Sequence, residues 1–258
     1  MTSTNAPDFV LVHGAFSDAS LWAGIVPQLE AAGAKVTTFD LPGHTAATNG
    51  AAGATTLAQY VEATHAVLAA APHPVILAGH SLAGMVIAQT AEDLPEKIAA
   101  LVFVCAFLPA SGRTATSYAE TDTASLFGAL LEADPAAGVG RMTAESLKQA
   151  VFSETAPDVA STAAAAGAKI AEPLQPFGTP VTLTPERFGR LERYYVMIEK
   201  DHAVTPTLQQ EMLDATPVER VFTMKADHAP MLSTPEELVE ALLAVRTHLA
   251  GVASAARG

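Results

Sequence analysis

A serine in a sharp turn is the first feature of the chain that points to chemistry. The segment Gly79–Gly84 reads Gly-His-Ser-Leu-Ala-Gly, follows an apolar run and opens a stretch with helical spacing. This is the context of the G-x-S-x-G nucleophile elbow, with Ala83 in place of the last glycine. Such a turn lifts the serine hydroxyl to the carboxyl end of a sheet, where the free N–H groups of the next helix face developing negative charge. We therefore predict that Ser81 is a nucleophile.

A serine hydroxyl needs a neighbouring base before it can attack a carbonyl carbon. The chain has eight histidines, and two of them, His202 and His228, follow Ser81 in loops directly after predicted strands. His228 lies between the last predicted strand and the last predicted helix, which is where the base of an elbow enzyme belongs. We expect His228 to be the base and keep His202 as the weaker candidate.

The base in turn needs a carboxylate that orients its ring, and this acid precedes the histidine in elbow enzymes. Asp201 directly follows the predicted strand that ends at Ile198. Glu199 is too close to the end of that strand, and Asp227 adjoins His228 and would face its Nδ1 atom poorly. We therefore expect Asp201 to be the acid.

Acyl transfer also requires two N–H donors for the oxyanion. One is predicted at Leu82, directly after the nucleophile, and the other in the loop that follows the first strand. In that loop Gly14 gives the backbone the freedom to turn the N–H of Ala15 inward. We predict an oxyanion hole formed by Ala15 and Leu82.

The spacing of apolar residues predicts the elements that would position these side chains. Six short apolar runs are typical of strands buried on both faces: 9–12, 35–39, 75–78, 101–104, 194–198 and 220–224. Stretches with helical periodicity alternate with them: 18–32, 55–71, 81–92, 206–213 and 235–250. This alternation predicts an α/β fold with a mostly parallel central sheet and helices on both faces.

Residues 109–185 have a different texture, rich in Pro, Gly, Ala, Ser and Thr, with helical segments near 125–132 and 143–152 and no clear buried strand. We expect an α/β core formed by 1–108 and 186–258, interrupted by a mainly helical insertion at 109–185. The insertion carries apolar side chains that favour an apolar pocket. The residues that we expect in the pocket wall are Gly14, Phe16, Cys105 and Phe127.

The chain resembles the α/β-hydrolase branch that contains plant methylesterases, plant hydroxynitrile lyases and bacterial carboxylesterases, including pyrethroid-type hydrolases. The resemblance rests on four stretches: Phe9–Ala15, Gly79–Gly84, Glu186–Gly189 and Ala226–His228. The spacing from Tyr195 through Asp201 to Pro206 also fits. The resemblance implies an α/β-hydrolase fold, a triad of Ser81, Asp201 and His228, and an insertion that forms a cap over the site.

Two departures from the lyases favour ester hydrolysis. The lyases carry a threonine at the position of Gly14 and a lysine directly after the catalytic histidine, where this chain has Ala229. Because the lyase reaction needs a cation near the leaving cyanide, we expect a serine carboxylesterase for small-to-medium, apolar esters. A hydroxynitrile lyase or other C–C-cleaving enzyme on the same triad, and a non-catalytic ligand-binding relative, remain alternatives.

Composition limits the partners. The chain has 14 Lys and Arg against 27 Asp and Glu, a net charge of −13, which argues against nucleic acids and anionic membranes. The polar start lacks the pattern of a signal peptide, and no uncharged apolar run is long enough to cross a bilayer. Cys105 is the only cysteine, so an intrachain disulfide and a Cys-cluster zinc site are excluded. We expect a cytoplasmic enzyme without cofactor or metal that acts on a small-molecule ester, and leave a homodimer open.

Overall fold

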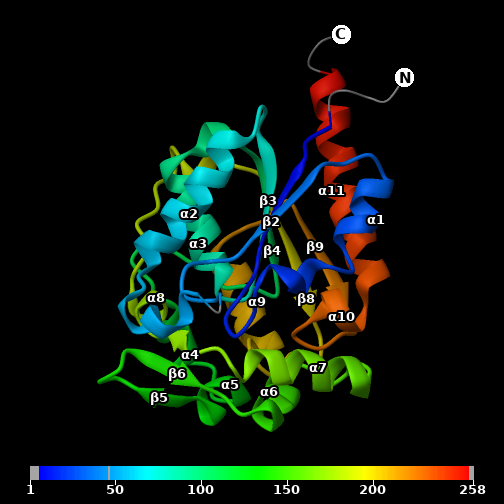
Figure 1. Cartoon of the computed structure of the whole chain (residues 1–258). Helices are drawn as coiled ribbons and strands as arrows, with labels where there is room; N and C mark the ends of the chain where they lie inside the picture. Colours follow the sequence, from blue (N-terminus) through cyan, green and yellow to red (C-terminus); the bar gives the residue numbers. More distant parts are fainter. Residues whose placement is uncertain (1–5, 46, 256–258) are drawn as a thin grey trace.

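A parallel sheet forms the centre of the fold. The computed structural model describes residues 6–45 and 47–255. Over these residues six strands pair side by side, all in parallel. In spatial order they are β2 (Val36–Phe39), β1 (Phe9–Val12), β3 (Val75–His80), β4 (Ile98–Val104), β8 (Arg193–Ile198) and β9 (Arg220–Met224). Each strand overlaps one of the six apolar runs, so the predicted α/β fold is confirmed (Figure 1).

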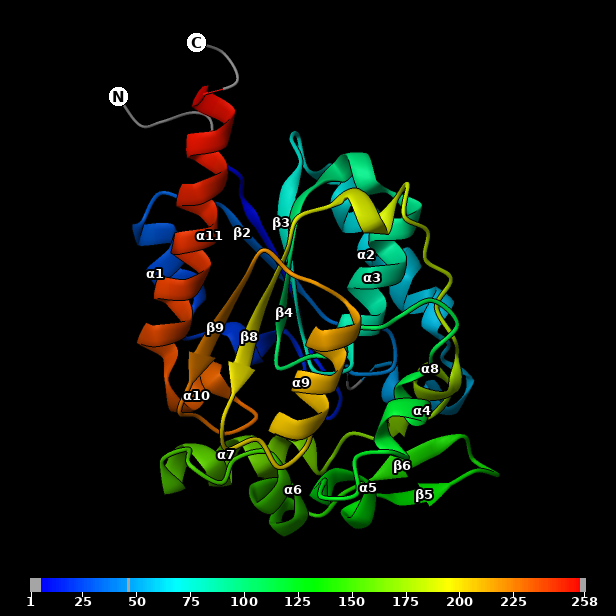
Figure 2. The ribbon, with the colours of Figure 1, turned by 180° about the vertical axis from the view of Figure 1, so that it is seen from behind.

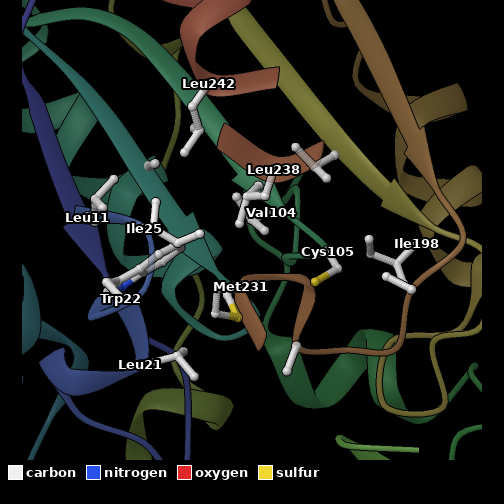
Figure 3. Close-up of a cluster of buried hydrophobic side chains, with 14 of the residues drawn as sticks. Leu11, Leu21, Trp22, Ile25, Val104, Cys105, Ile198, Met231, Leu238 and Leu242 are labelled. Carbon is white, nitrogen blue, oxygen red and sulfur yellow. The ribbon is translucent and has the colours of Figure 1, made fainter. Parts of the chain in front are cut away.

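Helices cover both faces of this sheet (Figures 1 and 2). One face carries α1 (Val26–Ala31) and α11 (Pro235–Ala255), and the other carries α2 (Leu57–Ala70), α3 (Ala83–Asp93) and α9 (Pro206–Ala215). Successive side chains of a strand point to opposite faces, so the neighbours Val10 and Leu11 of β1 enter different cores. Figure 3 shows the core under α11, to which Leu238, Met231 and Trp22 belong. The inner strands β1, β3, β4 and β8 are therefore buried on both faces, as their apolar runs predicted, whereas the edge strands β2 and β9 are partly exposed.

The predicted helix at 18–32 is split in two. It forms the 3-10 helix η1 (Ala19–Trp22) and, after a short break, α1 (Val26–Ala31). Asp18 caps η1 by accepting the N–H of Ser20, and Pro27 lies in the first turn of α1. A proline has no N–H and its ring clashes with the carbonyl four residues earlier, so one continuous helix cannot pass through Pro27. The break leaves Leu21 and Trp22 buried beside the end of the sheet.

The segment between β4 and β8 lies against the carboxyl ends of the strands (Figures 1 and 2). Its helices are α4 (Ala115–Ala119), α5 (Leu126–Leu130), α6 (Ala144–Ala150), α7 (Pro157–Gly167) and α8 (Gln175–Gly178). It also contains a small antiparallel sheet of β5 (Glu132–Asp134), β6 (Val139–Arg141) and β7 (Glu172–Pro173). The sequence showed no clear buried strand here, because these strands are very short and carry Glu, Asp, Gly and Pro, which strands disfavour.

The remaining described elements are short. They are η2 (Asn49–Ala54), η3 (Pro95–Lys97), η4 (Phe188–Arg190) and α10 (Pro230–Ser233). No helix within 6–45 and 47–255 combines the length and the apolar character that crossing a bilayer demands. The cytoplasmic location and the homodimer stay predictions.

Candidate active site

Ser81 lies in the tight turn between β3 and α3. Its backbone has a φ of 56°, in the left-handed region that costs a non-glycine residue about 1–3 kcal/mol and that tertiary packing must hold. The packing comes from α3, whose second residue, Gly84, lies directly against the chain after β4. A Cβ atom at Gly84 would lie 1.9 Å from the carbonyl oxygen of Phe107. A glycine is therefore required at Gly84 for α3 to approach closely enough to form the turn.

The three side chains predicted as a triad form one hydrogen-bonded row. His228 Nε2 is 2.9 Å from Ser81 Oγ, and His228 Nδ1 is 2.7 Å from Asp201 Oδ2. All three are buried, with Asp201 only 1% exposed. A carboxylate accepts the proton on Nδ1, which leaves Nε2 free to accept the proton of the serine hydroxyl. The row comes from the carboxyl ends of β3, β8 and β9, which parallel strands bring to one edge of the sheet.

Asp201 is held rigidly by the loop that it begins. Its Oδ1 atom accepts the N–H groups of Ala203 and Val204 at 2.8 and 2.9 Å. Gln209 Nε2 lies 3.4 Å from Oδ2, the oxygen that faces His228. The carboxylate therefore cannot turn, and Oδ2 stays aligned with the imidazole ring.

The other candidates lie elsewhere. Asp227 uses its carboxylate to accept the N–H groups of Glu154 and Thr155, which ties the segment between β4 and β8 to the loop after β9. His202 is exposed, with its Nδ1 atom 3.3 Å from the carbonyl oxygen of Gln149. Glu199 is exposed as well. The structure brings none of these three into the row with Ser81.

The loop after β1 packs directly against the serine. A Cβ atom at Gly14 would lie 2.8 Å from Ser81 Cβ and 2.9 Å from the carbonyl oxygen of His80, so only glycine fits there. Ala15, the next residue, lines the same cavity as Ser81. Within 6–45 and 47–255, neither the N–H of Ala15 nor that of Leu82 has a hydrogen-bond partner. Two free backbone donors therefore lie next to the serine.

Two cavities adjoin this loop. The serine cavity, of about 20 Å³, is lined by Ala15, Phe16, Ser17, Leu21, His80, Ser81, Phe127, Leu147, Val151, Phe152, His228 and Ala229. A larger one of about 400 Å³, which we call the α7 cavity, lies between α7 and the loop that carries η1, and shares Phe16, Ser17, Leu21 and Phe152 with the first. Of the four residues expected in the pocket wall, Phe16 and Phe127 line the serine cavity, whereas Gly14 and Cys105 do not.

Sequence reasoning missed several residues of this region. Leu21, Leu147, Val151 and Phe152 line the serine cavity, but their apolar periodicity is equally typical of ordinary helix cores. Glu172 is fully buried and its Oε2 atom accepts the N–H of Phe16 at 2.7 Å, across 156 positions of the chain. No local pattern in the sequence signals a contact of that range.

The alpha/beta hydrolase family model matches residues 9–241. The chain belongs to this family. It is 30% identical to a pyrethroid hydrolase of Sphingobium wenxiniae, over 91% of the chain and 86% of that protein. It is 29% identical, over 92% of its length, to an Arabidopsis thaliana protein named as a chloroplastic methylesterase, and spans 63% of that protein. The solved structure of a pyrethroid hydrolase has a TM-score of 0.84 at 27% identity, covering 95% of this chain and 98% of that one. These relatives support esterase activity in general.

One group of side chains has possible metal-ligand atoms that lie close enough to one another to bind a metal ion. The ligand atoms of His80, Cys105 and His228 lie within 4.8 Å of one another. His80 Nε2 and Cys105 Sγ are 2.7 and 3.4 Å from the carbonyl oxygen of His228, to which both donate. Burial raises the pKa of the Cys105 thiol well above its usual range, which disfavours the thiolate that a metal needs. These contacts explain the group as hydrogen-bonded packing behind His228.

Proposed function

We propose that this protein is a serine carboxylesterase that works through an acyl-enzyme. The observation that carries the proposal is the row Ser81–His228–Asp201 beside two unpaired backbone N–H groups. His228 takes the hydroxyl proton of Ser81 as the oxygen attacks the ester carbonyl carbon, and the N–H groups of Ala15 and Leu82 bind the oxyanion. His228 then protonates the leaving alcohol, and afterwards it deprotonates a water that releases the acid. Asp201 keeps the imidazole oriented and stabilises its cationic form.

The segment at 109–185 serves in this proposal as a cap over the core formed by 1–108 and 186–258. Four of its residues line the serine cavity: Phe127, Leu147, Val151 and Phe152. The ester therefore binds between the cap and the carboxyl end of the sheet, which excludes water from the oxyanion and strengthens its electrostatic stabilisation.

The proposed substrate is a neutral ester with one small and one larger apolar group. The serine cavity, at about 20 Å³, has room for about one water molecule, so the larger group must occupy the α7 cavity. At about 400 Å³ that cavity has the size of an ordinary ligand pocket. Asp18 and Asp158 lie in its wall, and no Lys or Arg lines either cavity within the described residues, so an anionic group is disfavoured.

We expect Ala163→Phe to raise the KM for 2-naphthyl acetate by about tenfold, because a ring on this face of α7 fills the α7 cavity. The KM for methyl acetate should change by less than about twofold, since both its groups are small. Ala165→Phe is the matched control, because Ala165 is an exposed residue of the same helix outside the cavity wall. Equal effects of Ala163→Phe on the two esters would contradict this placement of the larger group.

The decisive experiment for the reaction class compares ester hydrolysis with cyanide release. We expect turnover of 2-naphthyl acetate, covalent labelling of the protein by a fluorophosphonate, and only background cyanide release from mandelonitrile. The reason is that buried Ala229 follows His228 and that Lys225 in the preceding segment is exposed, so among the described residues no ammonium group lines the serine cavity. Cyanide release above background would favour a lyase, and absence of labelling would favour a ligand-binding relative.

A further inference from the structure

The two peptide groups that flank Ala15 are each held by a hydrogen bond to a different side chain. His13 Nδ1 lies 2.8 Å from the carbonyl oxygen of Gly14, and His13 Nε2 accepts the N–H of Leu41 at 2.9 Å. Burial lowers the pKa of His13 to about 3, so the ring is neutral and its single proton, on Nδ1, is donated to Gly14. Because a peptide group is planar and trans, fixing the carbonyl of Gly14 fixes the N–H of Ala15 in the opposite direction.

The second peptide group, between Ala15 and Phe16, is held from the cap. The N–H of Phe16 donates to Oε2 of Glu172 at 2.7 Å, and Glu172 belongs to β7. Phe16 has a φ of 53°, so the loop stores backbone strain that an external contact must balance. One residue further, His44 Nδ1 donates to the carbonyl oxygen of Ser17 at 2.8 Å.

Burying the carboxyl group of Glu172 is energetically unfavourable, and a contact that only attached the cap would not require it. It is fully buried, and burial raises its pKa. Its second oxygen, Oε1, lies 3.6 Å from His44 Nε2 and has no hydrogen-bond partner among the described residues. Burying a carboxylate in this way costs more than burying an apolar side chain of similar volume. The strong hydrogen bond that it does make is the one to Phe16.

We propose that Glu172 is a positioning residue for the oxyanion hole, which holds the Ala15–Phe16 peptide so that the N–H of Ala15 points at the ester oxygen. The inference rests on the proposed esterase function. Because Glu172 comes from the cap and His13 from the core, the peptide groups on both sides of Ala15 are held only while the cap is seated. An ester bound under a displaced cap would meet an Ala15 donor that is held on one side only, by His13 through Gly14.

The test replaces Glu172 with two side chains of similar volume. Glu172→Met removes the acceptor, and we expect kcat to fall about 10- to 100-fold with little change in KM, because one oxyanion donor is worth about 100- to 1000-fold when wholly lost. Glu172→Gln keeps an amide oxygen that can accept the N–H of Phe16, and should lose less than about fivefold. Equal losses in the two variants would overturn the proposal.

A pair of inhibitors separates positioning from a purely structural role. A trifluoromethyl ketone forms a hemiketal with Ser81 whose oxyanion occupies the hole, whereas the corresponding methyl ketone binds as a ground-state ligand. In Glu172→Met, the inhibition constant of the trifluoromethyl ketone should rise about 10- to 100-fold, in step with the loss in kcat. That of the methyl ketone should change less than about twofold. A loss of thermal stability with an unchanged ratio of the two constants would contradict the inference.

Glu92 supplies the matched control. It is a buried carboxylate at the end of α3 that accepts the N–H groups of Thr184 and Phe188, and it lines neither cavity. Glu92→Met should lower the melting temperature and leave the ratio of the two inhibition constants unchanged. If the wild-type chain neither hydrolyses esters nor binds the trifluoromethyl ketone more tightly than the methyl ketone, the esterase proposal fails. If it does both and Glu172→Met behaves like Glu92→Met, the positioning role of Glu172 is wrong but the esterase proposal stands.

Discussion

Ser81→Ala is expected to lower kcat for 2-naphthyl acetate by about 10⁶ and to abolish fluorophosphonate labelling. The substitution removes the oxygen that would form the acyl-enzyme, while His228 and Asp201 keep their own hydrogen bond. The fold should survive, because alanine at this φ of 56° is no more strained than serine and only the hydroxyl is lost. Initial rates and a gel of labelled protein measure the two effects.

An exposed serine gives the control for this variant. Ser161 lies on α7 and its hydroxyl donates only to the carbonyl oxygen of Pro157, so Ser161→Ala should keep the wild-type rate and labelling. The remaining activity of Ser81→Ala should come from the oxyanion donors and substrate binding, which alone give about 10³- to 10⁴-fold over water. Turnover of Ser81→Ala above a few per cent of wild type would mean that water attacks the ester directly, and the acyl-enzyme mechanism would be wrong.

The sequence predicted the four inner strands β1, β3, β4 and β8 well because they are buried on both faces. All six residues of Val75–His80 are buried, and Val75–Ala78 is an uninterrupted apolar run, which is typical of a strand covered on both faces. The side chains of the row were predictable for a related reason. Residues that directly follow parallel strands meet at one edge of the sheet, so Asp201 and His228 had to lie near Ser81 once the strands were placed.

Contacts that depend on the insertion could not be predicted. The strand β7 has two residues, Glu172 and Pro173, and neither favours a strand, so its pairing with β6 comes from tertiary packing. Without that strand nothing places Glu172 beside Phe16. The pocket wall shows the same limit, because Cys105, with a φ of 37°, turns behind His228 instead of facing the cavity. Sequence patterns tell which residues follow a strand but not which way the turn points them.

Asp201→Asn is expected to lower kcat by about 10⁴ through the wrong histidine tautomer. The N–H groups of Ala203 and Val204 both point at Oδ1, so the asparagine must keep its carbonyl oxygen there. Its NH₂ group then faces His228 Nδ1, which has to accept a hydrogen bond and move its proton to Nε2. An Nε2 that carries a proton cannot take the proton of Ser81. Steady-state kinetics with 2-naphthyl acetate, together with a thermal melt, measure the effect.

Asp227→Asn distinguishes the role of Asp201 from the general effect of removing a buried carboxylate. Asp227 is equally buried, adjoins His228 and accepts the N–H groups of Glu154 and Thr155, so its substitution should lower the melting temperature. It does not reach His228 Nδ1, so the tautomer is unchanged and kcat should fall by less than about tenfold. A larger loss of kcat in Asp227→Asn than in Asp201→Asn would contradict the assignment of Asp201 as the acid. The two variants therefore separate the group that orients the base from the group that anchors the cap beside it.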